Sequence, residues 1–376
     1  MSSLSCPNCH RLLASDSVDC RGCGRRVGFE PGCGHFHALD PDGDWYGPHG
    51  RALPLKPCGN AWLGVCNWLV ADDGPMCAGC KYNRVIPDLT IAGTLRRWTA
   101  IEIAKKQTIH ALIRLGIPPL TRAQDPRGLV FDFLYDPAAE QGLAPSLTTG
   151  HQSGLVTVNL IEADGVARER ARRDLGEPYR TLVGHFRHEL GHYYWHRLVE
   201  FTNDLLPFRA LFGDERVDYA AAQRSFYAQP GSSHSQDDFV SRYATMHPWE
   251  DFAETFAHYL HIVDTLDTIG ALGVSIDFTA GASTQSACVA FDPFTADTAT
   301  LIEAWVPLSS AVNAINRSMG QPDLYPFRIT PQVALKIDFV NRLLAFGAGR
   351  WSPGVLEQAD LKAMIATLGH RVELHG

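Results

Sequence analysis

The hydrophobic pattern of the chain changes character near residue 90. Residues 1–90 are rich in Cys, Gly, Pro and Asp and show no sustained helical period. From Thr94, apolar residues recur at the 3.6-residue period of an amphipathic helix, which Gly116 and the two prolines after it should end. We therefore predict two domains, residues 1–93 and 94–376. The predicted helical stripe consists of Leu95, Trp98, Ile101, Ile109 and Leu112.

Beyond this first helix, short strands give way to longer helices. Residues 129–135 and 155–161 are typical of strands, and the second run alternates apolar and polar residues. Residues 273–295 lack a regular pattern and are expected to form a long loop. The pattern predicts a mostly helical α+β domain with a small sheet, preceded by a small cysteine-rich domain. Further helices are expected at about 178–199, 215–228, 237–245, 248–266, 298–317 and 331–346.

Length, composition and charge narrow the function classes. The 376 residues suffice for two domains, and 45% hydrophobic with 20% charged residues is ordinary for a globular protein. The net charge of -8 argues against a general binder of nucleic acid or anionic membranes. There is no apolar run long enough for a transmembrane helix and no visible secretory signal. We expect a cytoplasmic protein.

Cysteine spacing indicates metal rather than disulfides in the N-terminal domain. Nine of the ten cysteines lie between positions 6 and 80. Cys6 with Cys9, and Cys20 with Cys23, form two Cys-x-x-Cys knuckles separated by ten residues. Four thiolates in this pattern suit a tetrahedral structural zinc, which would stabilise a domain too small to fold on its own core. A second, less regular four-sulfur site is predicted from Cys58, Cys66, Cys77 and Cys80.

Two cysteines fall outside these predicted sites. Cys33 has His35 and His37 close by, which leaves other ligand combinations open. Cys288 lies far from the rest, and we expect it to be a buried small hydrophobic side chain.

The cysteine-rich N-terminal domain resembles zinc-ribbon domains, which include nucleic-acid binders and protein-docking modules. Without a basic excess, we expect a structural or docking role, with a protein partner, and not nucleic-acid binding.

The strongest chemical signal is a His-Glu-x-x-His motif formed by His188, Glu189 and His192. On a helix, this spacing places both imidazoles on one face, where they can share a zinc ion. Glu189 lies on the same side and could act as general base on a zinc-bound water. His185 and His196 face the same way but are expected to be neighbours of the site or solvated. Because so short a pattern also arises by accident, the prediction of a zinc site depends on whether the chain offers a third ligand.

Other positions of the motif helix fit a buried environment. Phe186, Leu190 and Tyr193 occupy a separate arc suited to core packing. Gly184 and Gly191 flank the polar stripe, although Gly inside a helix costs about 1 kcal/mol relative to Ala. Close approach by another chain segment would explain their use.

A downstream helix supplies candidates for the third ligand. Glu250, Glu254, His258 and His261 share one face of it, opposite a largely apolar face. A carboxylate-bearing helix packed against the motif helix would complete a His2Glu site with one open position for water. Glu250 and Glu254 are the main candidates for the third ligand, and Asp251 is a weaker one. The carboxylate that does not bind zinc could hydrogen-bond a ligand histidine instead.

The two helices together resemble the gluzincin active site. The run Glu-Asp-Phe-Ala-Glu-Thr-Phe from Glu250 is similar to the second zinc-ligand helix of the anthrax lethal factor and Pro-Pro endopeptidase families. In those families the first Glu of the run binds zinc, and a Tyr seven residues earlier stabilises the oxyanion. The resemblance therefore implies Glu250 as third ligand and Tyr243 as oxyanion donor. The whole chain resembles a family of uncharacterised zinc-binding metallopeptidases with an N-terminal zinc ribbon, which implies a zincin-like fold.

The expected function is a zinc-dependent peptidase with one catalytic and one or two structural zinc ions, acting on peptide or protein substrates. Residues 155–161 could bind such a substrate as an added strand, or could be a plain half-buried strand. Asp214 and Glu215 could orient the site, but a solvated helix start explains them equally well. Two other functions remain open. One is a zinc-ribbon adaptor with a degenerate peptidase domain, and the other is a zinc hydrolase of a non-peptide amide.

Overall fold

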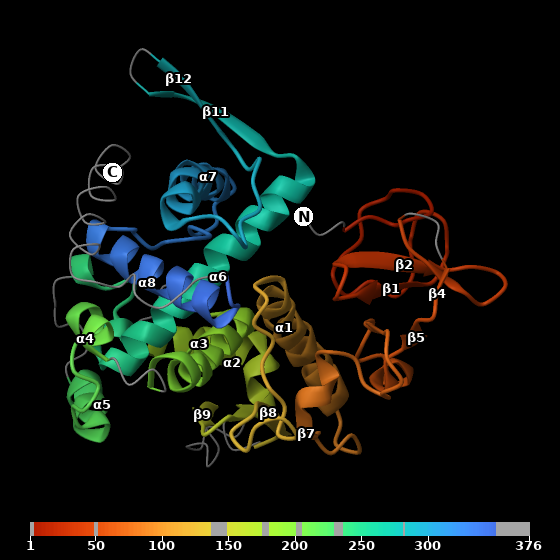
Figure 1. The fold of residues 1–376 in the computed structure, drawn as a ribbon, viewed down its shortest axis with the longest axis horizontal. Coiled ribbons are helices and arrows are strands. Elements are labelled where there is room, and N and C mark those ends of the chain that lie inside the picture. Colours follow the sequence, from red (N-terminus) through yellow and green to blue (C-terminus); the bar gives the residue numbers. More distant parts are fainter. Residues whose placement is uncertain are drawn as a thin grey trace. The chain divides into compact units, whose positions relative to one another are not determined.

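The computed structural model describes residues 4–48, 52–136, 149–174, 180–200, 205–228, 236–280 and 283–350 (Figure 1). The chain forms two compact units, Met1–Arg168 and Glu169–Gly376. Among the helices of these described residues, none is long and apolar enough to cross a membrane.

The N-terminal unit begins with a four-stranded antiparallel sheet in chain order, β1 (Val27–Glu30), β2 (His35–Leu39), β3 (Trp45–Tyr46) and β4 (Ala52–Leu53). A two-stranded pair follows, β5 (Lys56–Pro57) with β6 (Leu69–Val70). Single-turn 3₁₀ helices lie at Gly59–Leu63 and Cys80–Tyr82. The core of this region is aromatic: Phe29 contacts Phe36 with ring centroids 5.4 Å apart, and Trp68 packs against Phe29. Such short elements bury little apolar surface.

A second sheet in the same unit contains β7 (Asn83–Val85), β8 (Val130–Leu134), β9 (Gly150–Gln152) and β10 (Leu155–Asn159). Its spatial order is β7-β8-β10-β9, with β10 parallel to β8 and antiparallel to β9. Both sides of β10 are therefore hydrogen-bonded. Of the two interpretations of residues 155–161, substrate binding as an added strand is excluded for β10, because the chain turns at Gly154 and β9 covers that edge. The other interpretation, a plain half-buried strand, agrees with the structure.

Helix α1 (Thr94–Arg114) follows the predicted pattern and ends before Gly116, which has φ 76°. Four residues of the predicted stripe are fully buried, whereas Leu95 is 39% exposed and does not belong to it. The helix also buries Lys105, whose ammonium lies 2.7 Å from the carboxylate of Glu102. A hydrophobicity pattern assigns such a pair to solvent, so the sequence gives no sign of it.

The chain then becomes mostly helical, as the sequence predicts. The helices are α2 (Gly165–Asp174), α3 (Leu182–Tyr194), α4 (Leu206–Phe212), α5 (Tyr219–Ala228), α6 (Pro248–Leu272), α7 (Thr298–Ser318) and α8 (Pro331–Gly347). A single π-helical turn, Trp195–Val199, extends α3. Helix α6 packs against α3, α4, α7 and α8 and forms the centre of the C-terminal unit (Figure 1). Its buried aromatic residues are Phe252, Phe256 and Tyr259.

Several predicted elements differ in the structure. Residues 237–245 form two short 3₁₀ turns, Gln236–Asp238 and Tyr243–Thr245, and not a helix. The expected loop at 273–295 contains a hairpin of β11 (Ser275–Ala280) and β12 (Ser283–Cys288). Its described side chains are mostly exposed, so a hydrophobic pattern is weak there. Cys288 is exposed at the end of β12, which contradicts its predicted burial. The sequence pattern predicts neither α2, a charged helix with no apolar stripe, nor the short α4.

Candidate metal centre

Helix α3 carries the His-Glu-x-x-His motif. It begins after Thr181, whose hydroxyl oxygen accepts a hydrogen bond from the backbone N–H of Gly184 at 3.0 Å and so caps the helix. Phe186, Leu190 and Tyr193 are buried, as predicted from their arc. Because they fix the rotation of α3, the motif face turns toward α6.

A glycine in the motif sets the distance between the two helices. A Cβ atom placed on Gly191 would lie 2.8 Å from the Cα of Ala253 on α6 and 3.1 Å from its carbonyl oxygen. Real Cβ atoms do not approach a backbone so closely, so any larger side chain would force the helices apart. The expectation that another segment approaches this glycine is confirmed.

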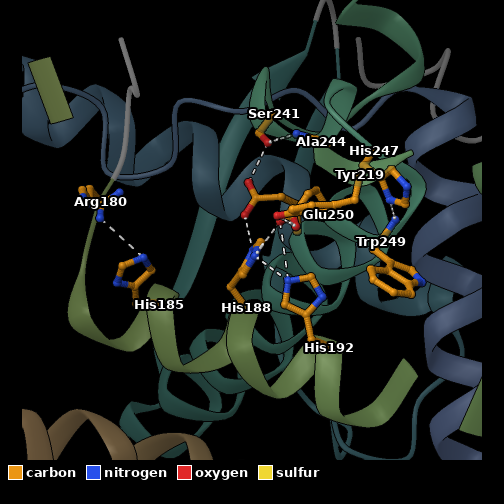
Figure 2. A network of polar contacts seen from close by, with 11 residues as sticks. Arg180, His185, His188, His192, Tyr219, Ser241, Ala244, His247, Trp249 and Glu250 are labelled. Carbon is orange, nitrogen blue, oxygen red and sulfur yellow. Dashed lines mark hydrogen bonds and ion pairs between the residues drawn. The ribbon is translucent and has the colours of Figure 1, made fainter. Parts of the chain in front are cut away.

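This close approach brings two histidines and one carboxylate together (Figure 2). Nε2 of His188 lies 3.1 Å from Nε2 of His192 and 2.9 Å from Oε2 of Glu250. Nε2 of His192 lies 3.5 Å from the same oxygen. His188 and His192 project from one face of α3, and Glu250 reaches them from the first turn of α6.

The spacing of these three atoms fits a metal ion. A tetrahedral ion with ligands at about 2.0–2.1 Å holds them about 3.3 Å apart, close to the three observed separations. Oε2 of Glu250 is buried and has no hydrogen-bond donor in favourable geometry among the described residues. Two imidazole lone pairs and a carboxylate oxygen facing one another would repel without a cation between them. The donor set of two imidazoles and one carboxylate suits Zn²⁺.

The electrostatics of the site favour positive charge. Burial opposes protonation of His188, but the nearby carboxylates of Glu250 and Glu254 raise its pKa well above 6.5. Burial likewise opposes ionisation of Glu250, yet the neighbouring histidines lower its pKa well below 4.5. Positive charge stabilises such a cluster, whether it comes from bound protons or from a bound metal ion.

A second carboxylate on α6 orients one of the histidines. Nδ1 of His188 donates to Oε1 of Glu254 at 2.8 Å, and Oε2 of Glu254 accepts a hydrogen bond from the hydroxyl of Ser241 at 2.6 Å. With its proton on Nδ1, His188 presents the lone pair of Nε2 toward His192 and Glu250. Asp251, the third carboxylate considered, instead pairs with Lys336 at 2.6 Å.

Two tyrosines complete the surroundings. The hydroxyl of Tyr219, at the start of α5, donates to Oε1 of Glu250 at 2.8 Å (Figure 2). The ring of Tyr243 lies 5.8 Å from that of His188, centroid to centroid. Burial and the charge of Glu250 raise the pKa of Tyr243 well above 10, so its hydroxyl stays protonated. Tyr219 is not among the residues predicted from the sequence, because no motif spacing relates α5 to α6.

Glu189 differs from the other two carboxylates. It lies on α3 between the histidines and is 7% exposed. Within the described part of the chain, no hydrogen bond or ion pair engages its carboxylate, although its charge acts on Tyr219. The carboxylate is therefore buried near the site, and it orients none of the residues that the structure describes.

The remaining candidate residues have other partners. His185 faces Arg180, 3.5 Å away, outside the His188–His192–Glu250 cluster (Figure 2). His196 bonds to Glu200 at 3.0 Å. Two acidic residues before α5 form ion pairs with arginines, Asp214 with Arg216 and Glu215 with Arg209. None of these four belongs to the cluster found among the described residues.

The N-terminal unit brings eight cysteines into two groups of four, Cys6 with Cys9, Cys20 and Cys23, and Cys58 with Cys66, Cys77 and Cys80. Backbone N–H groups point at several sulfurs, including that of Gly22 at Cys20 and that of Trp68 at Cys66. Hydrogen bonds of this kind stabilise thiolates. The two groups are those expected from the spacing of the cysteines, and four thiolates suit zinc.

Comparisons with known proteins agree with these features. A family model described as "Putative zinc-binding metallo-peptidase" matches residues 94–343, and a zinc-ribbon domain model matches residues 3–91. Uncharacterized proteins of Mycobacterium bovis and Mycobacterium tuberculosis are each 40% identical over 348 residues, which cover 92% of this chain and 95% of theirs. No solved structure gives a significant match.

Proposed function

The chain belongs to this family of zinc-binding metallo-peptidases, and we propose that it hydrolyses peptide bonds with a zinc ion held by His188, His192 and Glu250. The observation that carries the proposal is the convergence of their three ligand atoms at separations of 2.9, 3.1 and 3.5 Å. Three protein ligands leave one coordination position open, as catalytic zinc requires, whereas structural zinc is closed by a fourth.

In this proposal Glu189 is the general base. Zn²⁺ bound at these ligands lowers the pKa of a water molecule and polarises a carbonyl group. Glu189 accepts the proton of the attacking water and passes it to the leaving amine. Its carboxylate suits this role because the described residues leave it without a hydrogen-bond donor, unlike the carboxylates of Glu250 and Glu254.

The two tyrosines take different roles. Tyr243 donates a hydrogen bond to the oxyanion that develops as water attacks, and its raised pKa keeps the proton on the hydroxyl. Tyr219 acts on Glu250, because its hydrogen bond to Oε1 leaves Oε2 directed toward the histidines. Tyr219 is thus a positioning residue.

We further propose the domain division 1–93 and 94–376, with structural zinc in both cysteine groups and a gluzincin-type active site in the C-terminal domain. The zinc ribbon would serve as a structural or protein-docking module in a cytoplasmic enzyme. The family match from residue 94 and the zinc-ribbon match to residues 3–91 support the position of the boundary. This boundary differs from that of the compact units, which lies at Arg168 because α1 and the β7–β10 sheet belong to the N-terminal unit.

The test is cleavage of a peptide library by the zinc-loaded protein and by Glu189→Gln, with products identified by mass spectrometry. We expect cleavage by the wild type only, and equal zinc content in both proteins. Cleavage by the variant would contradict the assignment of the base. A parallel screen of isopeptides and other amides separates a peptidase from another amide hydrolase. A zinc-loaded wild type inactive on every substrate would favour the adaptor function.

A further inference from the structure

The hairpin between β1 and β2 carries a third group of ligating side chains in the N-terminal unit. Glu30 ends β1, Cys33 lies in the turn, and His37 lies on β2. One ligand atom from each of the three lies within 4.8 Å of the others. Neither cysteine group contains any of these residues, and the proposed peptidase site does not involve them.

The pairing register of the hairpin explains why they meet. Glu30 is paired with His35, and Gly28 is paired with His37. Since side chains alternate along a strand, Glu30 and His37 belong to the same face of the hairpin. The turn returns Cys33 over this face, and its Sγ lies 3.4 Å from Nε2 of His37.

The imidazole of His37 is fixed by packing. The residue is 2% exposed, and a Cβ atom on Gly47 would lie 2.7 Å from Cε1 and 2.9 Å from Nδ1 of its ring. Only a glycine at position 47 leaves space for the ring. Nδ1 is buried and has no hydrogen-bond partner within the described part of the chain. The opposite edge of the ring, with Nε2, is directed at Cys33.

The carboxylate of Glu30 is held in place by the turn itself. Oε1 accepts a hydrogen bond from the backbone N–H of Gly32, and Oε2 accepts one from that of Cys33, both at 2.7 Å. Each oxygen retains a further lone pair for a ligand. A backbone-held carboxylate beside a thiol and an imidazole is a preorganised donor set.

We propose that Glu30, Cys33 and His37 bind an additional metal ion, of the class of Zn²⁺. Thiolate, imidazole and carboxylate are the three ligand types that zinc takes in proteins. Three protein ligands leave one position for water or an external ligand, and Cys33 is exposed. This ion therefore exchanges faster than ions held by four cysteines. The proposal does not depend on the peptidase function.

The first test is the zinc content of the full-length protein. After reloading with zinc and gel filtration, elemental analysis should give about four zinc ions per chain, one for each described ligand group. Cys33→Ser should hold one ion fewer, with the other ions showing that the protein is folded. Cys288→Ser, which replaces another exposed cysteine outside every group, should match the wild type. Equal zinc in Cys33→Ser and the wild type would overturn the proposal.

A second test needs no variant. Iodoacetamide alkylation of Cys33, followed by mass spectrometry of its peptide, should slow by about tenfold or more when zinc is added to chelator-treated protein, since a metal-bound thiolate is a poor nucleophile. Alkylation of the exposed Cys288 serves as the internal control and should not change. The same rate at Cys33 with and without zinc would show an ordinary turn cysteine. In His37→Gln the protection by zinc should be lost.

Discussion

Nδ1 of His188 donates a hydrogen bond to Oε1 of Glu254 at 2.8 Å. Glu254 lies on α6, one helical turn after Glu250. Helix α6 therefore supplies both a proposed metal ligand and the residue that orients another one. Carboxylates in this position fix the tautomer of a ligand histidine and increase its basicity. The relationship ties the proposed zinc affinity of the site to a residue that does not contact the ion.

Replacing Glu254 should therefore weaken zinc binding without removing a ligand. We expect Glu254→Gln to lower the affinity of the His188–His192–Glu250 site by roughly 10–100-fold, the usual effect of losing such a partner. Chelator competition on the purified protein measures it. Ser241→Ala removes the hydrogen bond to Glu254 and the one that Ser241 accepts from the backbone N–H of Ala244, and leaves the Glu254 carboxylate in place. It is the matched control and should have a smaller effect. Unchanged affinity in Glu254→Gln would show that the hydrogen bond is incidental.

Substitutions of Tyr243 and Tyr219 should differ in their effects on kcat and on zinc affinity. Tyr243→Phe removes the proposed oxyanion donor and should lower kcat by about 10²–10³, with zinc affinity unchanged. Tyr219→Phe removes the hydrogen bond to Glu250 and should weaken zinc binding, with a smaller effect on kcat of the fully loaded enzyme. Both quantities are measured on a cleaved library peptide and by chelator competition. The reverse pattern would exchange the two roles.

The contact between α3 and α6 should tolerate no side chain at position 191. Gly191→Ala places a Cβ atom 2.8 Å from Cα of Ala253, and overpacking of this kind costs about 1–3 kcal/mol. Thermal unfolding should show a lower midpoint, although Ala is the better helix former. Gly165→Ala is the control, since a Cβ atom there meets nothing within 4 Å. Equal midpoints for wild type and Gly191→Ala would mean that the helices can separate at little cost.

Buried His258 should make the fold sensitive to acid. Burial lowers its pKa from 6.5 to about 4, while the charge of Glu254 acts in the opposite direction. Its Nδ1 lies 2.8 Å from the hydroxyl of Tyr325. Below pH 6.5 the unfolded chain binds a proton that the folded chain does not, so stability falls as the pH drops toward 4. The loss approaches about 3 kcal/mol at pH 4.

The variant His258→Gln isolates this contribution from the other titrating groups. Urea unfolding of the wild type and the variant is compared between pH 7 and pH 4. The variant should be less stable at pH 7, where it has lost a packed side chain, and the difference should narrow as the pH falls. Parallel curves for the two proteins would show that His258 does not titrate differently in the folded state.

Much of this architecture could be predicted from local patterns. The spacing of His188 and His192 predicts that they share a helix face, and the cysteine spacing predicts two four-sulfur groups. Contacts set by tertiary packing could not be predicted. Tyr219 meets Glu250 only because the first residue of α5 lies next to the start of α6, and no sequence pattern encodes that. The mostly exposed β11–β12 hairpin lacks a clear hydrophobic alternation, so its sequence predicts a loop.

His188 and His192 are proposed to hold a zinc ion in the peptidase domain. The most direct test of this proposal is the metal content by elemental analysis of the wild type and of a His188→Ala/His192→Ala double variant, both reloaded with zinc. We expect one zinc ion fewer per chain in the variant, with the cysteine-bound zinc unchanged. Equal zinc in the two proteins would contradict the proposal, because the His-Glu-x-x-His helix would then hold no metal.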